Sequence, residues 1–164
     1  RVFDDPRKEL PYSGVYCVKD YQVKLVSTDL DAPNGLALSP DEKMLYVNNW
    51  NDKRKVILSY EVNQDCTLSN SRLFFDMTNA PGSDALDGLK VDQKGNVYST
   101  GPGGLWIISP VGKQLGIIKV SDCNKVPCSQ VIECEKRLTI VHTLFLCLEI
   151  HSICDHLYFS SPDA

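Results

Sequence analysis

The sequence predicts an all-β protein built from repeated units, because short runs of β-forming residues alternate with turn residues along most of its length. Two stretches, 34–39 and 87–92, share a pattern in which a polar residue and a glycine precede alternating apolar residues. Each stretch leads into a polar turn and a second β-rich run. The stretches begin 53 residues apart. Repeats of about 40–50 residues with four short strands are typical of β-propeller blades.

The individual strands are expected where valine, leucine, isoleucine and tyrosine gather between turn residues. In the first complete blade we expect strands at 36–38, 45–48, 56–62 and 72–75. In the second we expect strands at 89–91, 97–99, 105–108 and 114–118. A hairpin at 15–18 and 23–26 precedes them and would be the outer half of another blade. The sequence thus predicts about two and a half blades of four antiparallel strands.

The repeat pattern stops after Lys119, which predicts a partial propeller over residues 1–119 and an unrelated tail over 120–164. The tail contains an apolar block, 138–148, whose pattern does not distinguish helix from strand. The codons of Lys119 and Val120 can spell an exon end followed by an intron start. We therefore expect the tail to be intron read-through or a mispredicted exon.

Composition excludes several classes of partner. The formal charge is −4 and the isoelectric point is near 5.3, so the chain has no basic surface of the kind that binds nucleic acid. No run of 18 apolar residues is present that could span a membrane. Residues 101–104 are rich in glycine but lack the Lys-Ser/Thr ending of a phosphate-binding loop, so we expect a corner between strands there.

The seven cysteines are an odd number without regular spacing, which does not indicate a disulfide framework. A reducing compartment, the cytoplasm, is the default expectation from this pattern. Five cysteines and all three histidines lie after residue 120. A zinc site at Cys147, His151, Cys154 and His156 is an alternative reading of the tail, but the spacing fits no common zinc module.

Catalysis by a serine or cysteine nucleophile with histidine is not expected within the repeats, because no histidine precedes residue 120. The candidate functional residues are instead Asn34 and Asp87, which occupy equivalent repeat positions just before an innermost strand. Such residues project into the mouth of a propeller's central channel. Their oxygens are suitable ligands for Ca²⁺, Mg²⁺ or Mn²⁺ and are tolerated by Zn²⁺. Alternatively, both are ordinary turn residues, because Asn and Asp tolerate left-handed backbone geometry.

Three stretches carry a family resemblance: DAPNGLALSPDEKMLYV at 31–47, DGLKVDQKGNVYSTGPGGLW at 87–106 and ISPVGKQLG at 108–116. Together they resemble the gluconolactonase or senescence marker protein (regucalcin)-like lactonase family, whose members are six-bladed β-propellers. The resemblance extends from about Pro6 to Lys119. It implies that this chain is a fragment of a six-bladed propeller.

The resemblance also implies a function, the metal-assisted hydrolysis of a sugar lactone. In the family one divalent cation is held in the channel by a Glu, an Asn and an Asp. The Asn of the P-N-G motif matches Asn34, and the Asp of the D-G-L motif matches Asp87, which would also orient or deprotonate the attacking water. We expect Ca²⁺ first, with Zn²⁺, Mn²⁺ or Mg²⁺ as alternatives. No residue here matches the family's Glu.

The sequence leaves two other functions open: an enzyme similar to strictosidine synthase or paraoxonase, and a propeller remnant without catalysis. The missing Glu favours the remnant. A partial propeller also leaves strand edges unpaired. We therefore expect the isolated chain to be marginally stable, prone to aggregation and impaired as a lactonase.

Overall fold

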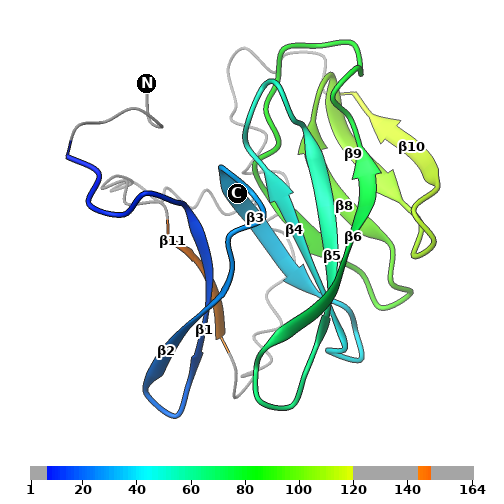
Figure 1. Cartoon of the computed structure of the whole chain (residues 1–164). Coiled ribbons are helices and arrows are strands. Elements are labelled where there is room, and N and C mark those ends of the chain that lie inside the picture. Colours follow the sequence, from blue (N-terminus) through cyan, green and yellow to red (C-terminus); the bar gives the residue numbers. More distant parts are fainter. Residues whose placement is uncertain (1–6, 120–143, 149–164) are drawn as a thin grey trace, which may run out of the picture.

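The computed structural model describes residues 7–119 and 144–148, which contain eleven β-strands in three antiparallel sheets. The sheets stand face to face in the order in which the chain forms them (Figure 1). Within these described residues there is no helix, and hence none that could cross a membrane.

The first sheet has the strand order β11-β1-β2. Its strands are β1 (Gly14–Lys19), β2 (Gln22–Ser27) and β11 (Leu144–Leu148). The second sheet has the order β3-β4-β5-β6, with β3 (Pro33–Leu38), β4 (Met44–Asn49), β5 (Val56–Val62) and β6 (Leu68–Asp76). The third has the order β7-β8-β9-β10, with β7 (Leu89–Val91), β8 (Val97–Gly101), β9 (Gly104–Ile108) and β10 (Gln114–Ile118). The second and third sheets are thus two four-stranded meanders.

All ten strands predicted before residue 120 are confirmed, most within two or three residues of their expected ends. The largest difference is the start of β6, at Leu68 instead of residue 72. The polar run Ser69-Asn70-Ser71 is typical of a turn, but here it continues the strand with Asn70 at a φ of 52°. The register shifts between Ser59 and Glu61 accommodate this irregular residue as a bulge.

Strand β11 lies within the apolar block 138–148, for which the sequence pattern left helix and strand open. It pairs antiparallel with β1, from Gly14 opposite Leu148 to Val18 opposite Leu144. The pairing gives β1 a hydrogen-bonded neighbour on the edge that faces away from β2. The remainder of 120–164 lies outside the described residues, so the boundary after residue 119 stays a prediction.

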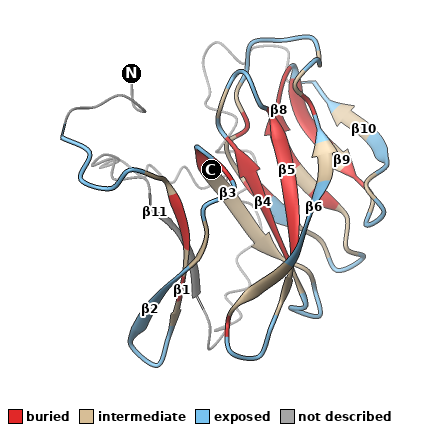
Figure 2. Ribbon diagram, viewed as in Figure 1, coloured by how far each residue is buried: buried red, intermediate tan, exposed pale blue. Residues whose placement is uncertain are grey.

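The central strands β4 and β5 of the second sheet are buried on both faces, as their red colour shows in Figure 2. Side chains alternate between the faces of a strand. Accordingly Leu45 and Val47 pack toward the first sheet, whereas Tyr46 between them packs toward the third. On β5, Leu58 packs toward the first sheet and Ile57 packs toward the third. The nearly continuous apolar runs of these strands are therefore explained by two cores, one on each face.

A disulfide joins the first sheet to the second, which corrects the expectation drawn from the irregular cysteine spacing. Cys17 on β1 is bonded to Cys66 in the turn between β5 and β6, with their Cα atoms 6.3 Å apart. Both residues are buried in the core between the two sheets. Beside them, Lys19 Nζ donates a hydrogen bond to the carbonyl oxygen of Gln64 over 2.9 Å. The expectation of a reducing compartment rested on the odd number and irregular spacing of the cysteines, and it stays a prediction.

Candidate functional site

The two candidate residues lie together between the second and third sheets. Asn34 is the second residue of β3, and Asp87 lies two residues before β7. Strands β3 and β7 are the first strands of their sheets and are in contact. Across this contact, Asn34 Nδ2 donates a hydrogen bond to Asp87 Oδ1 over 3.0 Å. The structure thus brings the two residues together, while their role as metal ligands stays a prediction.

Gly35 makes this close approach achievable. A Cβ atom at Gly35 would overlap the carbonyl oxygen of Asp87 and would stand 2.7 Å from the backbone nitrogen of Leu89. Both obstacles are backbone atoms, which cannot rotate away as a flexible side chain can. The glycine of the P-N-G motif is therefore required for packing between the sheets, since it has no β-carbon.

A third residue, Asn48, connects the same two turns. It is the fifth residue of β4 and is fully buried. Its Oδ1 accepts a hydrogen bond from the backbone N–H of Gly35 over 2.7 Å. Its Nδ2 donates to the carbonyl oxygen of Asp87 over 2.9 Å and to Ser99 Oγ over 3.3 Å. The sequence predicts a strand at residue 48 but assigns this residue no role; the available signal was an amide at the end of an apolar strand.

The backbone of Asp87 is also held from its own sheet. Its N–H donates to Thr100 Oγ1 over 3.0 Å, and the N–H of Thr100 donates to the carbonyl oxygen of Gly88 over 3.1 Å. Ser99 Oγ donates to the carbonyl oxygen of Thr100 over 3.0 Å. The turn that carries Asp87 is thereby fixed on both sides by buried polar side chains.

The pair fits part of a site for a hard divalent cation. Carboxylate and amide oxygens are the ligands that such ions prefer. A half turn of the Asn34 amide about its Cβ–Cγ bond would present Oδ1, in place of Nδ2, toward the Asp87 carboxylate. Both side chains are half-buried, so neither is sealed from water. Two oxygen ligands are available in this arrangement, and water would have to complete the coordination shell.

A third ligand of the family type is not found in the described part of the chain. No group of three or more His, Cys, Asp or Glu side chains there could hold a metal ion. Glu9 is exposed ahead of β1, and Glu42 belongs to the turn between β3 and β4, with a φ of 59°. The zinc alternative falls on side chains outside the described residues.

A second polar cluster lies in the connection that leads into β3. Asp31 accepts hydrogen bonds from the side-chain amides of Asn49, over 2.8 Å, and Asn51. Burial raises the pKa of Asp31, but the hydrogen bonds from Asn49 and Asn51 outweigh it, so the pKa lies below its ordinary value. Asn49 Oδ1 accepts from the backbone N–H of Ala32 over 2.9 Å. This cluster fixes the loop just before Asn34 within one sheet.

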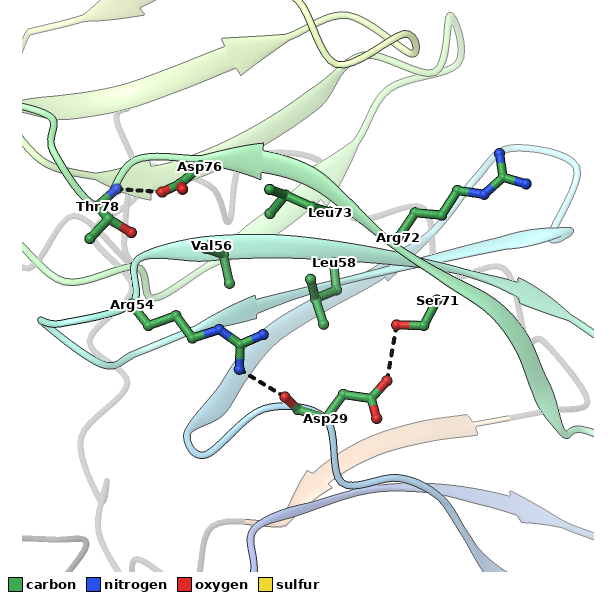
Figure 3. Close-up of a pocket in the computed structure, with 9 residues that line it drawn as sticks. All are labelled: Asp29, Arg54, Val56, Leu58, Ser71, Arg72, Leu73, Asp76 and Thr78. Carbon is green, nitrogen blue, oxygen red and sulfur yellow. Dashed lines mark hydrogen bonds between the residues drawn. The ribbon is translucent and has the colours of Figure 1, made fainter.

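A cavity of about 610 Å³ lies elsewhere, along β5 and β6 of the second sheet (Figure 3). Its lining comprises Asp29, Arg54, Val56, Leu58, Ser71, Arg72, Leu73, Asp76 and Thr78. Arg54 Nη1 donates to the carbonyl oxygen of Asp29 over 2.9 Å, and Ser71 Oγ donates to Asp29 Oδ2 over 3.0 Å. These polar groups bind one another, and neither Asn34 nor Asp87 lines the cavity. The cavity is therefore separate from the candidate site.

Comparison with known proteins identifies relatives of this chain. The family described as SMP-30/Gluconolactonase/LRE-like region matches residues 3–140, a range that extends beyond the boundary predicted after residue 119. A gluconolactonase from Zymomonas mobilis is 34% identical over 116 residues, which are 68% of this chain and 33% of that protein.

Two solved structures have similar folds. A gluconolactonase from Xanthomonas campestris aligns with a TM-score of 0.60 and 31% identity, over 69% of this chain and 36% of that one. A luciferin-regenerating enzyme aligns with a TM-score of 0.56 and 25% identity, over 67% and 38% of the two chains. The alignments thus span little more than a third of these relatives. They confirm the predicted fold class, an all-β fragment of a propeller.

Proposed function

We propose that this chain, which belongs to the SMP-30/gluconolactonase/LRE-like family, is part of an enzyme that hydrolyses a sugar lactone with the help of a divalent cation. The observation that carries the proposal is the contact between Asn34 and Asp87 across two sheets. Residues 53 positions apart in the sequence meet there, and their side chains carry a carboxylate and an amide oxygen, the ligand types that a divalent cation prefers.

In this proposal Asn34 and Asp87 hold the cation, with Ca²⁺ as the first candidate and Zn²⁺, Mn²⁺ or Mg²⁺ as alternatives. When bound, such an ion polarises an ester carbonyl and lowers the pKa of water. Asp87 has a second function, since its carboxylate can accept a hydrogen bond from the attacking water and then its proton. Water adds to the lactone carbonyl, the ring C–O bond breaks, and the released alkoxide takes up a proton to give the hydroxy acid.

The chain alone is expected to be an impaired lactonase. Its described residues supply two candidate ligands, one amide and one carboxylate, and contain no group of three His, Cys, Asp or Glu side chains that could hold a metal ion. Since calcium sites usually have six to eight oxygen ligands, we expect weak binding. The second candidate function is that of a propeller remnant that binds a cation without turnover. The lack of a third ligand of the family type among the described residues favours it.

Isothermal titration calorimetry of the full chain with Ca²⁺ and with Mn²⁺ tests the ligand assignment. Asp87→Ala and Asn34→Ala should each abolish binding. Asp41→Asn is the control, because Asp41 lies in the exposed turn at the opposite end of β3. Equal affinity in Asp87→Ala and the unchanged chain would refute the assignment. Proton release from D-glucono-δ-lactone, followed with a pH indicator, then separates an enzyme from a binding remnant.

A further inference from the structure

We infer that Asn48 is a positioning residue of the candidate site, which holds Asn34 and Asp87 at their contact distance by bridging the two sheets that carry them. This role rests on the proposed function, in which Asn34 and Asp87 hold the cation. Asn48 itself does not contact the lactone or the cation in this proposal. It acts through the backbone on both sides of the pair.

The bridge spans the sheets through one amide group. On its own sheet, Asn48 Oδ1 accepts from the N–H of Gly35, the residue that follows Asn34. On the neighbouring sheet, Asn48 Nδ2 donates to the carbonyl oxygen of Asp87 itself. Each candidate ligand is therefore at most one residue from a hydrogen bond to Asn48. A displacement of this amide would move the Asn34 turn and the Asp87 turn relative to each other.

Asparagine has the acceptor and the donors that the groups around position 48 require. Its oxygen accepts one hydrogen bond, and its two amide hydrogens are donated to Asp87 and Ser99. Aspartate would retain the acceptor but would place a second oxygen against the carbonyl of Asp87. Alanine would leave the part-buried N–H of Gly35 and carbonyl of Asp87 without this partner, and an unpaired polar group away from water costs stability.

The next residue provides a matched control. Asn49 is as fully buried as Asn48 and also makes three hydrogen bonds. Its partners Asp31, Ala32 and Arg54 all belong to the second sheet or to the connections at its strand ends. Loss of Asn49 should therefore cost stability without removing a bond between the sheets.

The first test compares Mn²⁺ affinity in the unchanged full chain, Asn48→Asp, Asn48→Ser and Asn49→Ser. Residues that orient metal ligands typically contribute 10- to 100-fold to affinity. We expect a loss in this range for both Asn48 variants and a change of less than about threefold for Asn49→Ser. Equal losses at positions 48 and 49 would overturn the positioning role, because both would then act through stability alone.

The second test needs no metal. The side-chain NH₂ signals of Asn34 in a ¹H–¹⁵N spectrum, identified by their disappearance in Asn34→Ala, report its hydrogen bond to Asp87. They should shift clearly in Asn48→Ser and much less in Asn49→Ser, because the bonds lost at position 49 lie within the second sheet and its connections. Unshifted signals in Asn48→Ser would refute the inference. If the unchanged chain binds no cation but these signals behave as expected, the metal proposal fails and the positioning role stands.

Discussion

Gly35 lies so close to the backbone of Asp87, across the boundary between two sheets, that no side chain fits between them. The P-N-G motif therefore combines two functions in adjacent residues. Asn34 supplies the side chain that reaches Asp87, and Gly35 supplies the space that lets the two sheets approach. The contact is a property of the packed sheets, and neither sheet contains it alone.

Gly35→Ala should disrupt this packing. Because the added methyl group meets backbone atoms, we expect the free energy of unfolding to fall by about 1–3 kcal/mol, the usual cost of overpacking. Cation binding should weaken as well. Gly116→Ala is the control, since a Cβ there has no neighbour within 4 Å. Urea unfolding followed by tryptophan fluorescence measures the free energy of unfolding of each variant. Equal stability of Gly35→Ala and Gly116→Ala would contradict the prediction.

Removal of the disulfide should destabilise the chain. Cys17 and Cys66 are 49 residues apart, and a closed loop of that length corresponds to roughly 4 kcal/mol in the chain-entropy model. The double variant Cys17→Ala/Cys66→Ala should show this loss in urea unfolding. Peptide mapping without reduction should recover residues 17 and 66 in one cross-linked fragment; two free thiols at these positions would contradict the structure.

Alkaline pH should destabilise the protein through Tyr60. Burial raises the pKa of its phenol to about 12, and a hydrogen bond from Ser27 only partly opposes this. The unfolded chain releases the same proton near pH 10, so the stabilisation is complete below about pH 10 and is lost as pH rises to about 12. Two pKa units correspond to about 3 kcal/mol.

Tyr60→Phe removes the titrating group, so its free energy of unfolding should fall less between about pH 9 and pH 11.5 than that of the unchanged chain. Tyr21→Phe is the control, because Tyr21 is fully exposed. Parallel pH profiles for Tyr60→Phe and the unchanged chain would contradict the prediction.

Strand β11 gives a test of the C-terminal region. Phe145 and Leu146 pair with Cys17 and Tyr16 on β1. Successive N–H groups of a strand point to opposite edges, so one of these two faces β1, and proline there cannot donate a backbone hydrogen bond to the ladder. We expect the double variant Phe145→Pro/Leu146→Pro in the full chain to expose the β1 edge and to promote association. Size-exclusion chromatography with light scattering would detect it. Unchanged mass and stability would favour the sequence-based view that residues 120–164 are unrelated to the fold.

The sequence predicted most of the fold because its strands carry local signals. Turn residues such as Gly95 and apolar runs such as 56–62 lie where the structure has turns and strands. The approach of Asn34 to Asp87 also followed from the sequence, because equivalent residues of successive blades meet at one end of the innermost strands.

Features that depend on contacts between sheets were not predictable in this way. Cys17 and Cys66 have five other cysteines as alternative partners, and no spacing rule selects among them. Asn48 has no local reason to be an asparagine, since its three partners lie on β3, the Asp87 turn and β8. Strand β11 depends on an edge of β1 that lies far away in the sequence.

The position of the candidate site at the boundary between two sheets has a thermodynamic consequence. Repeat units of this kind can fold and dock in separate steps. A ligand held jointly by Asn34 and Asp87 would bind only after both sheets have docked, so it would stabilise the docked state by mass action. Saturation with such a ligand should therefore merge two unfolding steps into one, making the bound molecule a source of cooperativity between neighbouring blades.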